Sequence, residues 1–354
     1  MHLFNLSYII NHIEEKYIKI SNITFDMELR SIQLDLTSRC NLGCDFCPYH
    51  GIEGIIKEVT ELPLEVYAKM VSDLATFPFK PTVKLAGSGE PTLYRDFDRL
   101  VLLMAEHGIP VRLITNGTTL DKKAEFLATT LSQLVVSIHG DEITHDKTVM
   151  MEGAYQRAYT GIEKVRSLNE SLPIIHHSVI TPQNYTYLES MADRAASYQT
   201  TPRFQHLKFT PGNDQLGDFD LTVLLFQMDK VRSRHVDAIF EPDMNPAEIK
   251  SYYDASKVFI LNKYGCWRVE IDVPVRRDGN VMACDGSSMG NITEQSILGI
   301  VAGQKRANFV RMVQLATRSP EGLPDFCSRC CYNSKEPVTL YSSAPDKIII
   351  GTTP

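Results

Sequence analysis

The chain has 354 residues, 43% of them hydrophobic and 22% charged, which is typical of a soluble globular protein. A formal charge of −7, with no dense stretch of lysine and arginine, argues against nucleic acid as a partner. No apolar run is long enough to cross a bilayer and the N-terminus lacks a signal-peptide pattern, so we expect a cytoplasmic protein without a membrane partner.

Strand-like and helix-like patterns alternate through the middle of the chain. The predicted strands cover residues 31–36, 82–86, 111–115, 133–138, 172–180 and 204–209. Helical periodicity lies between them, for example at 64–74 and at 97–104. Six strand–helix units predict a parallel sheet, because each crossover between parallel strands needs a helix-length return. In such α/β folds the chemistry lies at the carboxyl ends of the strands.

The last third of the chain has a different pattern. Residues 210–218 indicate a loop, and beyond them we predict a helix at 221–239, a hairpin at 267–282 and a helix at 297–315. These changes suggest four parts: an N-terminal extension (1–30), an α/β core (31–215), a helical connector (216–260) and a small C-terminal domain (261–354).

The eight cysteines fall into two groups. The first is Cys40, Cys44 and Cys47, directly after the first strand, and all the others follow residue 260. In a reducing compartment such close spacing predicts metal or iron–sulfur ligation. Three thiolates on one loop can hold one corner of a [4Fe–4S] cube and leave its fourth iron open. A zinc site needs a fourth ligand, for which His50 is available, so zinc remains an alternative.

The Cys-x3-Cys-x2-Cys spacing, with the aromatic Phe46 before the last cysteine, resembles the signature of the radical S-adenosylmethionine (SAM) family. This resemblance covers about residues 31–210. It implies a partial (β/α)6 barrel, whose open iron chelates SAM and whose reduced cluster cleaves SAM to a 5′-deoxyadenosyl radical. The backbone at Phe46 would lie near the adenine.

Other segments agree with the family in order along the chain. The segment 88–91, Ser-Gly-Glu-Pro, resembles the Gly-Gly-Glu-Pro turn after the second strand, where Glu90 and the adjacent backbone would contact the SAM ammonium group. Ser137 would match a contact to the SAM ribose or carboxylate, and Ile180 would match the contact to the adenine. The resemblance and the strand ends together give these expected SAM-binding residues: Phe46, Ser88, Gly89, Glu90, Asn116, Ser137 and Ile180.

The second cysteine group has its own spacing. A hairpin with Gly279 in its turn would bring Cys266 and Cys284 side by side, and a helix would return the chain to Cys327 and Cys330. Four thiolates close a site, so both zinc and a second [4Fe–4S] cluster fit. The spacing resembles the SPASM/twitch region of radical SAM enzymes. Five cysteines fit the shorter twitch form, with one auxiliary cluster, better than full SPASM.

Cys331 remains outside this set of four ligands. We interpret it as a spare thiol beside the cluster. It could also replace Cys330 as a ligand, or donate a hydrogen atom to a substrate radical as a cysteine does in radical epimerases.

The substrate side of the site is less defined by the sequence. Candidate catalytic residues are His139 and Lys208 near strand ends, Arg268 and Glu270 after Cys266, and Cys331. A single auxiliary cluster, and the absence of an extra domain before residue 31, favour oxidation of a small polar metabolite such as a sugar, aminocyclitol or nucleoside. An electron donor such as flavodoxin or ferredoxin is the expected protein partner.

Two alternatives stay open. One is a peptide-modifying maturase that forms a crosslink or an epimer, and a short precursor peptide encoded nearby would favour it. The other is a non-catalytic iron–sulfur electron carrier or a zinc scaffold. A carrier needs neither an open iron nor the Gly-Glu-Pro turn, so the sequence favours an enzyme.

Overall fold

The computed structural model describes residues 29–52, 54–56, 58–77, 79–207, 219–254, 266, 268–284, 286–316 and 327. Its strands form one sheet in the order β10-β9-β8-β1-β2-β3-β4-β5-β6-β7. These strands are β1 (Ser31–Leu34), β2 (Thr82–Leu85), β3 (Val111–Thr115), β4 (Gln133–Ser137), β5 (Ile174–Ile180), β6 (Thr201–His206), β7 (Ile239–Glu241), β8 (Asp272–Val275), β9 (Asn280–Met282) and β10 (Ser288–Asn291).

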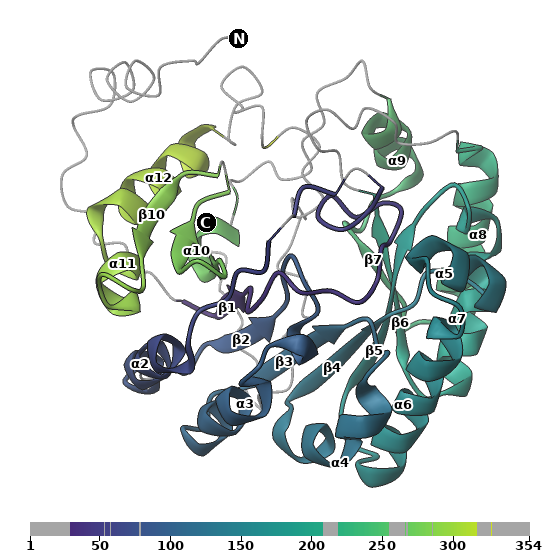
Figure 1. The fold of residues 1–354 in the computed structure, drawn as a ribbon. Coiled ribbons are helices and arrows are strands. Elements are labelled where there is room, and N and C mark those ends of the chain that lie inside the picture. The colour runs from purple at the N-terminus through teal and green to yellow at the C-terminus, as the bar shows by residue number, and fades with distance from the viewer. Residues whose placement is uncertain are drawn as a thin grey trace.

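Strands β1 to β7 are parallel, and helices connect them along the outer side of the curved sheet (Figure 1). The helices of this part are α2 (Leu64–Ala75), α3 (Phe97–Glu106), α4 (Leu120–Thr130), α5 (Glu142–Val149), α6 (Ala154–Leu168), α7 (Leu188–Ser197) and α8 (Leu221–Arg234). The predicted α/β barrel fold is therefore confirmed. None of the described helices is both long and apolar enough to span a membrane.

Alternate side chains along a strand point to opposite faces of the sheet, and this explains how the helices pack on one face. On β4, Leu134 and Val136 belong to the same buried apolar cluster as residues of α4 and α6, so this face of the sheet packs on helices. Gly117, at the end of β3, has a φ of 80°, and a Cβ there would lie 2.8 Å from the Cβ of Ala158 on α6. Glycine is needed where the chain turns this closely under a helix.

Two expectations about the later strands need correction. The helix predicted to reach residue 239 ends at Arg234, and the chain then forms β7, a seventh parallel strand. Phe240 of β7 stacks on Phe204 of β6, with 5.4 Å between ring centroids. The sixth strand begins at Thr201, earlier than predicted, because its pairing with β5 starts there. Neither pairing is visible in a single segment's periodicity.

The C-terminal hairpin also differs from its prediction. Residues Arg268–Ile271 form a short helix, α10, and the hairpin consists of β8 and β9 only. Strand β8 pairs in parallel with β1, so the C-terminal strands continue the barrel sheet instead of forming a separate one. The Asp272 carboxylate explains part of this attachment: it forms a salt bridge with Lys84 at 2.6 Å and accepts a hydrogen bond from Ser31 at 2.8 Å.

Three helices complete the described fold: α9 (Pro246–Tyr253), α11 (Ile297–Val301) and α12 (Gln304–Ala316). Helix α11 packs against α2, where the amide of Ile297 donates to the Asp73 carboxylate at 3.2 Å. Ile297 and Ile300 join the same buried cluster as Met70. Helix α11 and the barrel thus share one apolar cluster.

Candidate cluster and cofactor site

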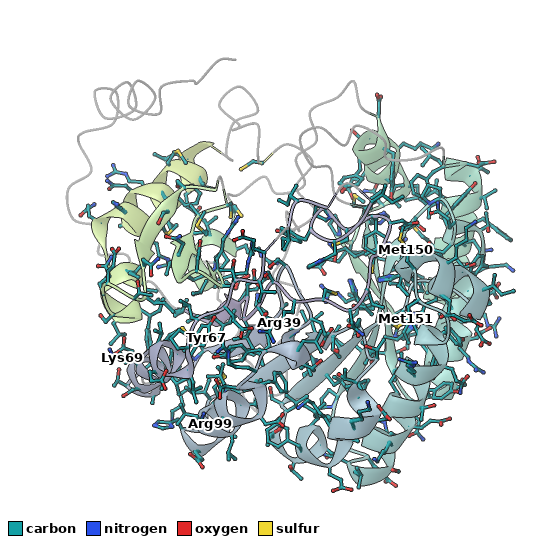
Figure 2. The ribbon with its side chains drawn as sticks, viewed as in Figure 1. Arg39, Tyr67, Lys69, Arg99, Met150 and Met151 are labelled. Carbon is teal, nitrogen blue, oxygen red and sulfur yellow. The ribbon has the colours of Figure 1, made fainter. Side chains whose placement is uncertain are left out.

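Cys40, Cys44 and Cys47 lie on the loop between β1 and α2. The amide of Cys47 donates to the carbonyl of Cys44 at 2.9 Å, which closes a tight turn. The loop is fixed against the end of α5, because the amide of Asp45 donates to the carbonyl of Thr148 at 2.9 Å. Cys40, Cys44 and Met151 all pack against one small apolar cluster that includes Leu42 and Val149, and Figure 2 shows Met150 and Met151 beside this loop.

Burial and neighbouring negative charge act on the thiols of Cys40 and Cys44. Burial raises the pKa of Cys40 to about 11, and the nearby Glu90 and Cys47 add to this rise. Burial raises the pKa of Cys44 to about 12, and negative charge on Cys40 or Cys47 adds to it. Three thiolates on this loop therefore need a cation to compensate them. The irons of a cluster supply that charge, so the donor set fits the cofactor.

Among the described residues, no three Cys, His, Asp or Glu side chains gather around one point closely enough to hold a single metal ion. In a [4Fe–4S] cube each thiolate binds its own iron, so the sulfurs need not converge on one ion.

The turn that contains Gly89 and Glu90 packs directly on the connection from β1 to Cys40. A Cβ on Gly89 would lie 2.4 Å from the carbonyl oxygens of Thr37 and Arg39. The amide of Glu90 donates to the carbonyl of Arg39 at 2.7 Å. Arg39 is labelled near the centre of Figure 2. The turn and the cysteine loop therefore form one unit, and only glycine permits this approach.

The carboxylate of Glu90 is buried and well hydrogen-bonded. Its Oε1 accepts from the hydroxyls of Thr92 and Thr115, both at 2.7 Å, and its Oε2 accepts from the amide of Asn116 at 2.8 Å. Burial nevertheless raises the pKa of Glu90, because these donors offset the loss of water only in part. A cation beside Oε2 would favour the ionised form.

Asn116 is linked to the cysteine loop by side chains. Its Nδ2 donates to Oδ1 of Asn41 at 3.0 Å, and Asn41 donates to the hydroxyl of Thr118 at 2.8 Å. That hydroxyl donates back to Oδ1 of Asn116 at 2.7 Å. Sequence reasoning named Asn116 from its strand end but missed Asn41. The position of Asn41, directly after Cys40, was the available signal.

His139 lies against the aromatic residue of the cysteine loop. Its ring is 4.9 Å from that of Phe46, centroid to centroid, in an edge-to-face arrangement. The Nδ1 of His139 accepts from the amide of Val179 at 3.2 Å, so a neutral ring carries its proton on Nε2. Burial lowers the pKa of His139 well below its usual value. These contacts favour a fixed hydrogen-bond donor over a general base.

Other predicted residues are placed differently. Ser137 ends β4, half-buried at the expected rim. Ile180 is fully buried in a cluster with Leu188 and Met191 of α7, so its side chain faces the helices. A contact to adenine at this position would fall to the backbone. Lys208 lies outside the described residues.

Arg268 and Glu270 are engaged within the C-terminal part. Arg268 forms a salt bridge with Asp272 at 2.9 Å. Glu270 accepts a hydrogen bond from Gln314 on α12, and burial raises the pKa of Glu270. These contacts hold both side chains within the C-terminal part. Their expected roles at the substrate stay predictions.

The second cysteine group is described in part. Cys266 and Cys327 join one apolar cluster with Val269, Val310 and Val313, and the carbonyl of Cys266 accepts from Gln314 at 3.2 Å. Cys284 follows β9 and is exposed. Cys330 and Cys331 lie outside the described residues. The fold therefore brings two of the predicted ligands together and places a third on the hairpin arm.

Comparison with known proteins agrees with this arrangement. The family model of the radical SAM superfamily matches residues 34–195, and that of the SPASM iron–sulfur cluster-binding domain matches residues 266–331. The chain belongs to the radical SAM superfamily, a superfamily of enzymes, and carries a SPASM-type C-terminal domain. These two matches confirm the family expected from the cysteine spacings. They imply SAM and iron–sulfur clusters as cofactors.

Several known proteins are similar to this chain. Fe-coproporphyrin III synthase from Methanosarcina barkeri is 30% identical over 193 residues, or 53% of this chain and 47% of that protein. Mycofactocin maturase MftC from Mycolicibacterium smegmatis is 27% identical over 177 residues, or 49% of this chain and 43% of that protein. The chain spans about half the length of these curated relatives.

A solved structure shows the same fold. SuiB from Streptococcus suis, bound to S-adenosylmethionine, aligns with a TM-score of 0.62 at 13% identity, over 94% of this chain and 87% of SuiB. A second structure shows SuiB bound to its precursor peptide SuiA, with a TM-score of 0.60 at 15% identity, over 86% of this chain and 71% of SuiB. This likeness supports the fold alone.

Proposed function

We propose that this chain catalyses a SAM-dependent radical reaction at a substrate carbon, with its cluster on Cys40, Cys44 and Cys47. When bound, the cluster and SAM supply a 5′-deoxyadenosyl radical that abstracts a hydrogen atom. The observation that carries this proposal is the packing of the three-cysteine loop on the Glu90 turn, whose amide donates to the carbonyl of Arg39 at 2.7 Å. The expected reductant is a flavodoxin or ferredoxin in the cytoplasm.

Glu90 is the proposed partner of the SAM ammonium group. Its Oε2 accepts a hydrogen bond from the amide of Asn116 and, as a carboxylate oxygen with two lone pairs, can accept another. A buried carboxylate with a raised pKa binds a cation favourably, because the cation offsets the cost of burying the negative charge. Asn116, Phe46 and Ser137 are proposed to complete the pocket for SAM from neighbouring strand ends.

The second cluster is proposed to lie on Cys266, Cys284, Cys327 and Cys330, within a C-terminal domain of residues 261–354. Such a cluster accepts one electron from a substrate radical while a base removes a proton, which gives net oxidation. A small polar metabolite such as a sugar, aminocyclitol or nucleoside is the proposed substrate. The five-cysteine spacing supports one auxiliary cluster.

A peptide substrate is the second candidate. SuiB, whose fold is similar, has been seen with a precursor peptide, and MftC is a maturase. A peptide substrate predicts a short precursor gene beside this one, whose product loses two hydrogen atoms on crosslinking and keeps its mass on epimerisation. Sugar-biosynthesis genes in that place would support the metabolite.

Iron and sulfide analysis after anaerobic reconstitution tests the proposal. The wild-type chain is expected to hold about eight irons, and a Cys40/Cys44/Cys47→Ala variant about four, with 5′-deoxyadenosine formed by the wild type alone. A wild type with about four irons and a variant with none would leave no auxiliary cluster. That result would reject substrate oxidation and favour a redox-neutral rearrangement or epimerisation.

A further inference from the structure

Three side chains from distant segments meet beside the Gly89 turn. Arg277, in the turn between β8 and β9, donates from Nη1 to the hydroxyl of Ser88 at 2.7 Å and to Oδ2 of Asp35 at 3.1 Å. The Ser88 hydroxyl donates to the same Oδ2 of Asp35 at 2.7 Å. Asp35 and Ser88 are buried, with 9% and 5% of their surface exposed, so this ion pair is shielded from solvent.

The two glycines that flank Ser88 leave its turn no room to shift. A Cβ on Gly87 would lie 2.2 Å from Cγ of Asp35, and one on Gly89 would lie 2.4 Å from the carbonyl oxygen of Arg39. The turn is held between the Asp35 side chain on one side and the approach to Cys40 on the other. A change at Ser88 is therefore transmitted to Glu90, whose amide donates to Arg39.

Arg277 belongs to the arm that carries a cluster ligand. The chain runs from Arg277 through β9 to Cys284. Strand β8 is fixed to the barrel by its parallel pairing with β1, and the amide of Asp35 donates to the carbonyl of Val275 at 2.9 Å. The tip of the hairpin thus contacts the SAM-binding turn while its far strand leads to the auxiliary site.

Ser88 stands where the family turn has its first glycine, and a glycine there would have no hydroxyl to bridge Asp35 and Arg277. We propose that Arg277 is a positioning residue that couples the C-terminal cluster arm to the SAM-binding turn through Ser88 and Asp35. SAM then binds more tightly when Cys284 is ligated, and by linkage SAM strengthens the ligation of Cys284. This coupling rests on the proposed function, because it requires that the Gly89–Glu90 turn binds SAM.

The first test compares SAM affinities of anaerobically reconstituted protein by equilibrium dialysis. Arg277→Met and Ser88→Ala are each expected to weaken SAM binding about five- to tenfold, in the range of known coupling energies. Arg277→Lys keeps the charge and should recover part of the loss. Arg276→Met is the matched control, because Arg276 is the exposed neighbour, and its affinity should equal that of the wild type.

The second test is a double-mutant cycle with Cys284→Ala. This change should weaken SAM binding severalfold in the wild-type background and leave it unchanged in the Arg277→Met background. SAM should change the electron paramagnetic resonance signal of the reduced first cluster less in the variants that bind SAM more weakly.

Wild-type affinity in both Arg277→Met and Ser88→Ala would overturn the coupling, as would an equal effect of Cys284→Ala in both backgrounds. Ser88→Ala keeps the result decisive if Arg277→Met fails to fold. A wild type that holds both clusters but binds no SAM would overturn the proposed function and the coupling with it. Normal SAM binding with no coupling would reject the coupling alone.

Discussion

The main-chain amide of Asn116 donates to Oε2 of Glu90 at 2.8 Å, which joins the ends of β3 and β2 at the edge where the cysteine loop lies. Glu90 receives further hydrogen bonds from Thr92 and Thr115. One buried carboxylate therefore joins its own turn to the end of β3 before any cofactor binds. The charge of this carboxylate is expected to affect SAM binding, and its acceptor atoms are expected to affect the free energy of unfolding.

We expect Glu90→Gln to lower the free energy of unfolding by about 1–3 kcal/mol and to weaken SAM binding. The amide nitrogen of glutamine would face donors that now need an acceptor, and a buried unmatched polar group costs this amount. Thermal unfolding and SAM dialysis measure the two effects. Glu106→Gln, on the exposed side of α3, is the control and should change neither. Unchanged stability in Glu90→Gln would contradict the role of both carboxylate oxygens as acceptors.

Substitution by alanine should have different effects on SAM binding at two glycines of the site. Gly89→Ala would place Cβ 2.4 Å from two carbonyl oxygens, so the turn must move and SAM binding should be lost. Gly43→Ala, within the cysteine loop itself, would meet Met150 at 3.4 Å and His50 at 3.6 Å, which are ordinary contacts. We expect Gly43→Ala to keep its iron content and SAM affinity. An equal loss in both variants would contradict the packing described here.

Asp272 should contribute strongly to holding the C-terminal strands on the barrel. Although burial opposes its charge, Arg268 and Lys84 hold the pKa of Asp272 below its usual value. This stabilisation is present above the unfolded pKa of the carboxyl group and is lost as the pH falls through the lowered, folded pKa.

Replacing Asp272 by asparagine leaves Lys84 buried without its charged partner, which should lower the free energy of unfolding by about 3–5 kcal/mol. The exposed Lys123–Asp98 pair, at 2.7 Å, is the control, and Asp98→Asn should cost about 1 kcal/mol or less. Urea unfolding at pH 7.5 measures both. A similar small cost for the two variants would mean that the buried pair contributes nothing to this attachment.

Buried histidines should make the fold sensitive to acid. Burial lowers the pKa of His176 to about 3 and that of His145 to about 4, and neither ring nitrogen of His176 has a hydrogen-bond partner among the described residues. The unfolded chain binds a proton below about pH 6.5, whereas the folded chain does not. Stability is therefore constant above this pH and falls below it.

For His176 alone the loss is about 1.4 kcal/mol per pH unit below pH 6.5. In His176→Phe the free energy of unfolding should fall less steeply between pH 5.5 and 4.5, by nearly this amount. At pH 8 the two proteins should differ little, because the apolar ring fills the same site beside Tyr159. Parallel pH profiles would show that His176 is already charged in the folded protein.

Sequence reasoning reached the family because its signals are local. The spacing of Cys40, Cys44 and Cys47 and the segment from Ser88 to Pro91 are contiguous patterns, and each follows a strand whose alternation is visible in its own residues. The same reasoning placed the end of α8 and the start of the C-terminal hairpin wrongly. Both depend on which strand of the sheet the next strand pairs with.

Short spacings and periodicities in the chain encode the strand–helix alternation of the barrel, the cluster loop and the class of chemistry. The pairing of β8 with β1, the orientation of Ile180 toward the helices and the contacts of Arg277 with Ser88 and Asp35 appear in the folded structure alone. Parallel pairing and buried ion pairs join residues far apart in the chain. Their partners are selected by the closing of the whole core, and no local pattern records that choice.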